Sequence, residues 1–285
     1  MLTNLTDILE QAERDNYGVI APDFVNLYGA KCMLETAEEL QAPLILSYSS
    51  SFKPVMDVRS YARFIKILIQ EIEQYSTQVC LHLDHAASLA EIQEAVDVGF
   101  TSVMIDASTA PLEDNIALSR KVVELAGPVG VSVEAELGHV TTGEGYIKTG
   151  AGDELLTDPD QAGEFVERTG IDALAVAIGN VHGAYIGDPD LDFTRLEKIR
   201  SAVDVPIVLH GSSGIGMDEL GQAITGGIRK INLYSELITS IFQHTRTVLS
   251  ETLTDPLRVY RSQTEAINAV LSRYILASGS AGRSA

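Results

Sequence analysis

Short apolar runs alternate with longer amphipathic segments along most of the chain. The apolar runs are almost continuous and rich in Val, Ile and Leu, a pattern typical of parallel strands that are buried on both faces. Strands are therefore predicted at residues 18–23, 43–49, 79–84, 102–106, 131–137, 174–178, 206–210 and 230–233.

The segments between these runs carry helical patterns, and residues 89–98 give the clearest example. Their apolar residues recur with the helical period, Ser88 stands at the N-cap position, and Glu91 follows three residues later. Gly99 then stands where helices commonly end. A helix is therefore expected over residues 89–98.

Strands that alternate with helices indicate an α/β protein with a parallel sheet, and a count of eight favours a closed (β/α)8 TIM barrel. The 285 residues suit one such barrel, and neither a linker nor an internal repeat divides the chain. We therefore expect a single TIM-barrel domain over residues 1–285. A doubly wound open sheet has the same alternation and is the alternative fold. Residues 138–158 show neither pattern and are expected to form a binding loop or lid.

Composition restricts the partners and the compartment. The chain has 40 acidic and 20 basic residues and a formal net charge of −20, so nucleic acid and anionic membranes are not expected as partners. Cys32 and Cys80 show no pairing motif, the first residues lack a signal-peptide pattern, and no apolar run is long enough to span a membrane. A cytoplasmic protein is expected. A small anionic substrate would need a local positive site, such as a metal or backbone N–H groups.

Polar residues at the ends of the predicted strands are the candidates for chemistry, because barrel enzymes place their active sites there. Three of the six histidines, namely His85, His182 and His210, stand at such ends. Three neutral imidazoles that leave a fourth position open form a catalytic Zn²⁺ site. Any one of these histidines taken alone is better explained as a hydrogen-bonded residue at the rim, and it is the three together that make a metal site an equal alternative.

Three carboxylates stand near these histidines. Asp84 precedes His85 and can serve either as a general acid/base or as a residue that orients a histidine ligand. Glu134 and Glu136 share one face of their strand because side chains alternate with a period of two. An electrostatic role in a site and an ordinary salt bridge both remain open for this pair.

A glycine- and serine-rich stretch at residues 211–216 follows the seventh predicted strand. Its backbone N–H groups can approach an anion closely, although such a stretch is also an ordinary turn. Asn232 and Ser235 follow the eighth strand. Barrels commonly bind phosphate after these two strands, so the position favours a phosphate site.

Five blocks of sequence, in the same order, resemble the class II, zinc-dependent ketose-bisphosphate aldolases, the family of the fructose- and tagatose-bisphosphate aldolases. The blocks are residues 81–85 (LHLDH), 133–138 (VEAELG), 175–183 (AVAIGNVHG), 208–211 (VLHG) and 230–232 (KIN). The resemblance implies a carbon–carbon lyase of carbohydrate metabolism, glycolysis included, that reversibly cleaves a phosphorylated ketose into dihydroxyacetone phosphate and an aldehyde. It also implies Zn²⁺, Na⁺ or K⁺ as a further ion, and a homodimer or homotetramer.

The resemblance assigns roles to individual residues. It implies zinc ligands at His85, His182 and His210, with a carboxylate able to approach the metal at Glu136. It implies proton exchange with the C4 hydroxyl at Asp84, and acid/base action on the donor's C3 carbon at Glu144. The implied donor phosphate site comprises Gly183, Gly211, Ser213, Asn232 and Ser235. The distal end is implied to involve Ser49 and, from a neighbouring subunit, Arg261.

The chain departs from the family pattern at several positions, and two of these departures bear on phosphate binding. Gly187 stands where a lysine is expected, and Asp23 stands where an asparagine is expected. Both changes weaken phosphate binding if they face the phosphate. The alternatives are therefore a metal-dependent aldolase or epimerase with a non-standard, unphosphorylated donor, and a non-catalytic partner subunit, against which the histidines, Asp84 and Glu144 argue. The sequence leaves open the ketose, the number of subunits and the physiological direction.

Overall fold

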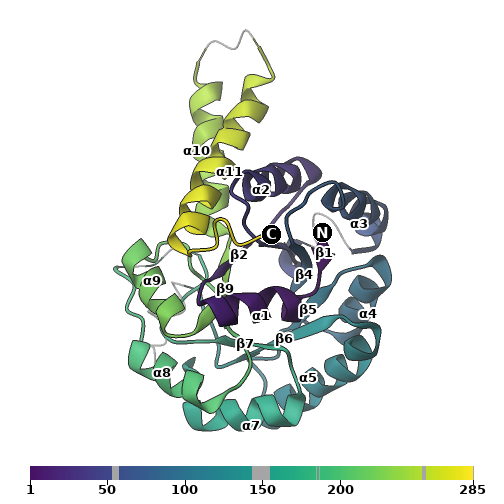
Figure 1. The fold of residues 1–285 in the computed structure, drawn as a ribbon, viewed down its shortest axis with the longest axis vertical. Helices are drawn as coiled ribbons and strands as arrows, with labels where there is room; N and C mark the ends of the chain where they lie inside the picture. The colour runs from purple at the N-terminus through teal and green to yellow at the C-terminus, as the bar shows by residue number, and fades with distance from the viewer. Residues whose placement is uncertain (53–57, 143–154, 184, 186, 252–254, 285) are drawn as a thin grey trace.

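Eight parallel strands close into a barrel that is surrounded by helices (Figure 1). A computed structural model describes residues 1–52, 58–142, 155–183, 185, 187–251 and 255–284. The strand order is β4-β3-β2-β9-β8-β7-β6-β5, and a further pairing of β4 with β5 completes the circle. The predicted TIM barrel is therefore confirmed, and the open sheet is excluded.

The strands lie where the apolar runs predict them, with each end within two residues. They are β2 (Val19–Pro22), β3 (Leu44–Ser49), β4 (Val79–Ala86), β5 (Ser102–Ile105), β6 (Ser132–Leu137), β7 (Ala173–Val176), β8 (Ile207–Leu209) and β9 (Ile228–Leu233). A short strand that the sequence pattern does not predict, β1 (Leu2–Thr3), pairs with the beginning of β4.

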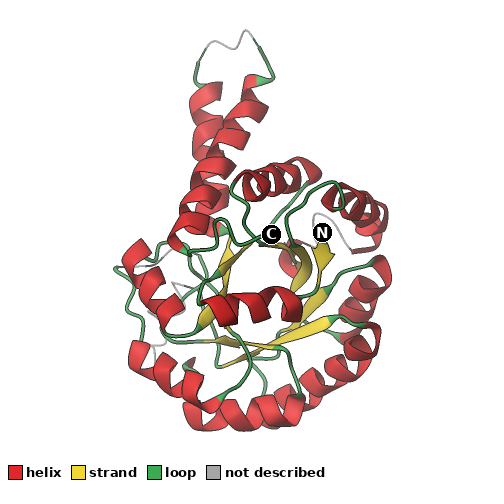
Figure 2. Cartoon of the chain, viewed as in Figure 1, coloured by secondary structure: helices red, strands yellow, loops and turns green. Residues whose placement is uncertain are grey.

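Most of the helices form the outer ring of the barrel (Figure 2). The helices of the chain are α1 (Leu5–Asp15), α2 (Leu27–Glu39), α3 (Val58–Ile72), α4 (Leu89–Val98), α5 (Leu112–Ala126), α7 (Pro159–Thr169), α8 (Phe193–Ala202), α9 (Met217–Thr225), α10 (Ser235–Leu249) and α11 (Arg258–Ala277). Helix α4 has the predicted bounds: Ser88 Oγ accepts from the Glu91 N–H, and Gly99 ends the helix with a φ of 106°. None of the described helices is both long and apolar enough to cross a membrane.

Two apolar cores hold the barrel together. The larger one lies between the outward faces of the strands and the helices. The smaller one fills the barrel near the start of the strands, where Ile45, Cys80 and Val208 pack with Ile8 and Leu9 of α1. Helix α1 lies across that end of the barrel (Figure 1). One end of the barrel is therefore closed by packed apolar side chains, and the opposite end is left for a site.

Two further features bear on the expectations above. Cys32 and Cys80 are both buried and unpaired, as expected from their spacing.

Helices α10 and α11 pack side by side and project well beyond the barrel as one arm (Figure 1). The arm exposes large apolar side chains: Phe242 is 66% exposed and Leu257 is 60% exposed.

Candidate active site

The inward faces of the strands change from apolar to titratable along their length. On β4 the alternation carries Cys80 in the apolar core and then His82 and Asp84 toward the carboxyl end. On β6 the same alternation brings Glu134 and Glu136 inward, and both are fully buried. The period of two therefore concentrates ionisable groups at the open, carboxyl end of the barrel.

His85 reaches the site through an irregularity in β4. Strict alternation would point it away from Asp84, but the pairing of β4 with β5 shifts register between Leu83 and Ala86. His85 itself has a φ of 51°, which is an uncommon, left-handed conformation for a residue other than glycine. The bulge turns the imidazole inward, so Asp84 and His85 both face the site.

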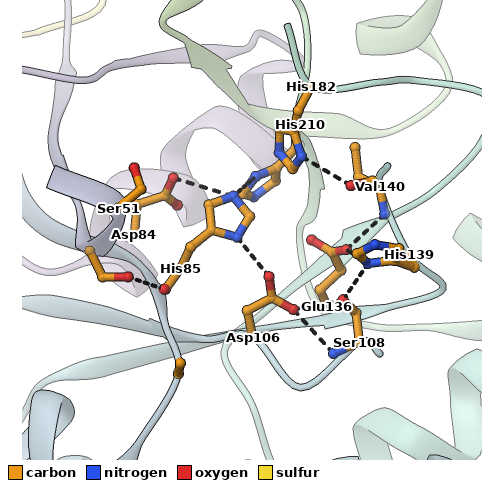
Figure 3. A network of polar contacts seen from close by, with 12 residues as sticks. Ser51, Asp84, His85, Asp106, Ser108, Glu136, His139, Val140, His182 and His210 are labelled. Atoms are coloured by element: carbon orange, nitrogen blue, oxygen red, sulfur yellow. Dashed lines mark hydrogen bonds and ion pairs between the residues drawn. The ribbon is translucent and has the colours of Figure 1, made fainter. Parts of the chain in front are cut away.

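The three sequence-predicted histidines meet at this end of the barrel (Figure 3). The ring centroids are 4.9 Å apart for His85 and His182, 4.7 Å for His85 and His210, and 5.8 Å for His182 and His210. They come from β4 and from the segments that follow β7 and β8. Each ring offers one nitrogen to a set of atoms that all lie within 4.8 Å of one another.

Each imidazole has one nitrogen held by an oxygen acceptor of the protein. The pairs are His85 Nδ1 with Asp106 Oδ2 at 2.9 Å, His182 Nδ1 with the Val140 carbonyl at 3.0 Å, and His210 Nε2 with Glu134 Oε1 at 2.9 Å. Such acceptors place the imidazole proton on the nitrogen that they contact. The second nitrogen of each ring is thereby left to face the common centre.

The remaining nitrogens fit a divalent cation. His85 Nε2 and His210 Nδ1 lie 3.0 Å apart, a distance that suits either a shared proton or a shared cation, because two bare lone pairs would repel each other there. His182 Nε2 is buried and has no hydrogen-bond partner in the described part of the chain. Three imidazoles that leave a further position open are typical of catalytic Zn²⁺ sites. His85, His182 and His210 are therefore the residues that would hold a metal.

The electrostatics of the metal-free site point the same way. Burial by itself lowers the pKa of His85, but the carboxylates of Asp84 and Asp106 outweigh it and raise the pKa to about 10. Burial, together with the positive charge of the neighbouring His210 and His85, lowers the pKa of His182 to about 3. The carboxylates around His85 therefore favour a positive charge at this centre.

Asp84 lies beside this centre and is held by several partners. Asn232 Nδ2 donates to both carboxylate oxygens, at 3.2 and 3.1 Å, and His85 Nε2 lies 3.6 Å from Oδ2. Burial opposes ionisation of Asp84, but His85 and His82 keep its pKa well below the ordinary value. The site thus presents an ionised, fixed carboxylate next to the place where the metal would lie.

Glu136 lies behind His85 in a second, overlapping group. His85, Asp106 and Glu136 also have ligand atoms within 4.8 Å of one another. Glu136 Oε1 accepts from the Val140 N–H at 2.9 Å, and Oε2 is buried without a partner in the described residues. Burial and the charge of Asp106 raise the pKa of Glu136 to about 8. A carboxyl group that is buried and unsatisfied in this way is well placed to move toward a cation.

A cavity of about 330 Å³ opens above the histidines and takes in most of the predicted substrate residues. Its lining includes Ser49, Gly183, Gly211, Ser213, Asn232 and Ser235. Gly211 has a φ of 63°, and a Cβ there would lie 2.1 Å from the Val181 carbonyl oxygen, so no other residue fits. Helix α10 begins at Ser235, and its Glu236 N–H donates to Ser213 Oγ at 3.0 Å. A ligand can therefore come close to the backbone at this wall, and a helix N-terminus lies beside it, as in known anion sites.

One predicted substrate residue does not line this cavity. Arg261 lies on the arm, on α11, where it is exposed and pairs with Asp255. Glu144 falls outside the described residues. Gly187 is not among the cavity-lining residues, whereas Asp23 and Tyr234 are, beside Ser51 and Phe52.

The sequence analysis did not identify three residues near the candidate metal ligands. One contacts a ligand directly, and the other two contact a residue that does. Asp106 holds His85, Ser108 Oγ donates to Asp106 Oδ1 at 2.7 Å, and Lys230 pairs with Glu134. Asp106 is the last residue of a predicted strand, so its position at the active rim was a usable signal. No local pattern marks Ser108, and Lys230 lies in one of the five family-like blocks but was given no role there.

Comparisons with known proteins point to one enzyme family. The family model described as "Fructose-bisphosphate aldolase class-II" matches residues 3–283. A fructose-bisphosphate aldolase of Geobacillus stearothermophilus is 37% identical over 293 residues, which cover 100% of this chain and 99% of that protein. The crystal structure of the YdjI aldolase from Escherichia coli K12 superposes with a TM-score of 0.89 at 33% identity, over 100% of both chains.

A more distant structure shares the fold. The fructose-bisphosphate aldolase of Campylobacter jejuni superposes with a TM-score of 0.82 at 22% identity, over 98% of this chain and 96% of that one. The family of this chain is an aldolase family that acts on phosphorylated sugars and generally uses a divalent metal. The chain, with its three convergent histidines and its match over almost the full length, belongs to the class II fructose-bisphosphate aldolase family.

Proposed function

We propose that the protein is a zinc-dependent aldolase that reversibly cleaves a ketose 1,6-bisphosphate of the fructose or tagatose type into dihydroxyacetone phosphate and an aldehyde. Residues 1–285 form one catalytic domain in this proposal, and the family match over residues 3–283 supports it. The observation that carries it is the facing pair of ring nitrogens, His85 Nε2 and His210 Nδ1, at 3.0 Å with His182 Nε2 unsatisfied beside them.

The chemistry needs a group that accepts negative charge. A divalent cation held by His85, His182 and His210 supplies Lewis-acid stabilisation of the charge that develops when a carbon–carbon bond beside a carbonyl breaks. Such stabilisation makes a lysine Schiff base unnecessary.

The protein's own residues move the protons. Asp84 takes the proton of the C4 hydroxyl as the C3–C4 bond breaks, and C4 leaves as the aldehyde carbon. Asn232 fixes the carboxylate for this transfer through contacts to both of its oxygens. Glu144 then delivers a proton to C3, which completes dihydroxyacetone phosphate. In the direction of synthesis each transfer runs in reverse.

The donor phosphate binds at the glycine- and serine-rich wall of the cavity. Gly183, Gly211 and Ser213 line that wall, and Ser235 starts helix α10 beside them. Their small side chains leave the backbone N–H groups open to an anion, and the helix N-terminus favours negative charge. Such a site compensates locally for a chain whose formal net charge is −20.

A cleavage assay over a panel of ketose phosphates, with and without chelator, tests the proposal. We expect release of dihydroxyacetone phosphate from a ketose 1,6-bisphosphate, loss of that activity after treatment with a chelator, and recovery with one Zn²⁺ per chain. The coupled reduction of dihydroxyacetone phosphate reports the rate. Activity that survives complete removal of metal, or no cleavage of any member of the panel, would overturn the proposal.

We also propose a homodimer or homotetramer in which Arg261 serves a neighbouring active site. Arg261 lies on the projecting arm and does not line the cavity of its own chain, and the arm exposes Phe242 and Leu257. An arm with such a surface is suited to bind a second copy, and a measurement of the mass of the protein in solution tests the number of subunits.

We propose a cytoplasmic location because the two cysteines are buried and unpaired. We propose Na⁺ or K⁺ as a further ion because of the family resemblance.

One observation favours a second candidate, an aldolase of the same family whose substrate carries no phosphate at one end. Asp23 lines the cavity near Ser49, and its buried Oδ1 has no hydrogen-bond partner among the described residues. Burial and the nearby Asp84 raise the pKa of Asp23 well above its ordinary value. An unsatisfied carboxyl group suits a hydroxyl or ammonium group of the substrate better than a phosphate dianion.

The isosteric change Asp23→Asn separates the two candidates. If Asp23 selects against phosphate, the variant is expected to raise the ratio of kcat/KM for a 1,6-bisphosphate over the matching 1-phosphate by about 10–100-fold, the effect of one charged hydrogen bond. The matched control is Asp97→Asn on the exposed face of α4, which changes net charge equally. An unchanged ratio in Asp23→Asn excludes this second candidate.

A further inference from the structure

Lys230 is a lysine buried inside the barrel, below the metal-binding histidines. It lies on the inward face of β9, its side chain is 0% exposed, and its neighbour in the ladder is Val208 of β8, two residues before His210. Its Nζ lies 2.8 Å from Glu134 Oε2 and 3.9 Å from Asp84 Oδ1. Burial of an ammonium group is costly unless it is paired, so this lysine is held there by its partners.

Glu134 connects this lysine to a candidate metal ligand. Its Oε2 forms an ion pair with Lys230 at 2.8 Å that lacks hydrogen-bond geometry, and its Oε1 accepts from His210 Nε2 at 2.9 Å. A carboxylate with one oxygen fixed by an ammonium group has a fixed direction for the other oxygen. That second oxygen decides which nitrogen of His210 carries the proton and in which plane the ring lies.

A third buried group completes the surroundings of Glu134. His82 Nδ1 contacts Ser102 Oγ at 2.8 Å, and His82 Nε2 lies 3.6 Å from Glu134 Oε2. Burial and the charge of Lys230 lower the pKa of His82. Among the lysines and arginines that the structure describes, Lys230 alone forms an ion pair with Glu134.

We propose that Lys230 is a positioning residue for the metal centre, acting through Glu134 to hold His210 with Nδ1 free toward the cation. The inference rests on the proposed function, because it assumes a metal at His85, His182 and His210. Lys230 does not line the cavity and touches no substrate in this proposal. Its effect reaches the metal only through Glu134 and the ring of His210.

The test compares metal binding by the full chain and by Lys230→Met. We expect Lys230→Met to bind Zn²⁺ about 10–100-fold more weakly in competition with a chromogenic chelator, as outer-shell changes do. We also expect an altered visible absorption spectrum of the Co²⁺ form, because the geometry at one ligand changes. Wild-type affinity together with a wild-type Co²⁺ spectrum in Lys230→Met would overturn the proposal.

A second pair of variants keeps the test decisive if Lys230→Met does not fold. Lys230→Met combined with Glu134→Gln has no buried charge at either position and retains an oxygen that accepts from His210 Nε2. Lys230→Met combined with Glu134→Met also has no buried charge, but it lacks the acceptor. The glutamine form is expected to bind Zn²⁺ about 10–100-fold more tightly than the methionine form, and equal affinities would overturn the proposal.

These measurements also separate this proposal from the proposed function. If the wild-type chain binds neither Zn²⁺ nor Co²⁺, the metal centre itself is wrong. If the wild-type chain binds both and Lys230→Met binds them equally well, only the role of Lys230 is wrong.

Discussion

Replacement of His182 by alanine is expected to remove the bound metal and the aldolase activity together. The loss of metal affinity should exceed the roughly 10–100-fold effect of losing an outer-shell partner, because a direct ligand disappears. His182 Nε2 has no hydrogen-bond partner among the described residues, so the change removes a cation ligand and breaks no protein contact at that atom. Metal content of the purified variant and its cleavage rate, measured on the same sample, check the result.

The control for this variant is His244→Ala. His244 lies on α10, where its Nδ1 contacts the Ser240 carbonyl, and it should leave the metal content unchanged. Thermal melting of the metal-free forms separates a folding defect from lost ligation. A His182→Ala protein that still carries one metal per chain would contradict the assignment of the site.

The fold was predictable because buried parallel strands are marked by continuous apolar runs. The ends of the strands were less predictable than their existence, and β7 shows the reason. The apolar run extends through Ala177 and Ile178, but their N–H groups bond to the Thr157 hydroxyl and the Asn180 side chain rather than to a neighbouring strand. Hydropathy registers burial and cannot distinguish these bonding partners. The arm of α10 and α11 escaped prediction because its exposed apolar residues resemble a core pattern.

The candidate site was predictable where chemistry coincides with a strand end, as for His85, His182 and His210. Their convergence then followed from the barrel, which brings all carboxyl ends of the strands to one face. The inward turn of His85 could not be predicted, because it depends on the bulge between Leu83 and Ala86. Lys230 was equally hidden, since a lysine inside an apolar run gives no indication that a glutamate on a distant strand faces it.

The roles of the carboxylates are the part of the site that the sequence left open, and Asp84→Asn addresses it. We expect this variant to lose about 10²–10⁴-fold in kcat, the usual contribution of general acid–base catalysis, while its metal content stays unchanged. An amide has the same shape as the carboxylate but cannot take the proton of a hydroxyl group. Asn232 can still donate to the remaining oxygen, so the position of the side chain should be kept.

A comparison with Asp106→Asn separates a role of Asp84 in proton transfer from a role in metal binding. Asp106 contacts His85 Nδ1 at 2.9 Å and should act on metal affinity, so excess Zn²⁺ should restore much of the lost activity in that variant. Excess Zn²⁺ should not restore Asp84→Asn, because the missing function there is proton transfer. If it does restore activity, Asp84 acts on His85, which lies 3.6 Å away, and not on the substrate. The proton of the C4 hydroxyl would then need another acceptor in the cavity, and Asp23 is the remaining carboxyl group that lines it without a hydrogen-bond or ion-pair partner among the described residues.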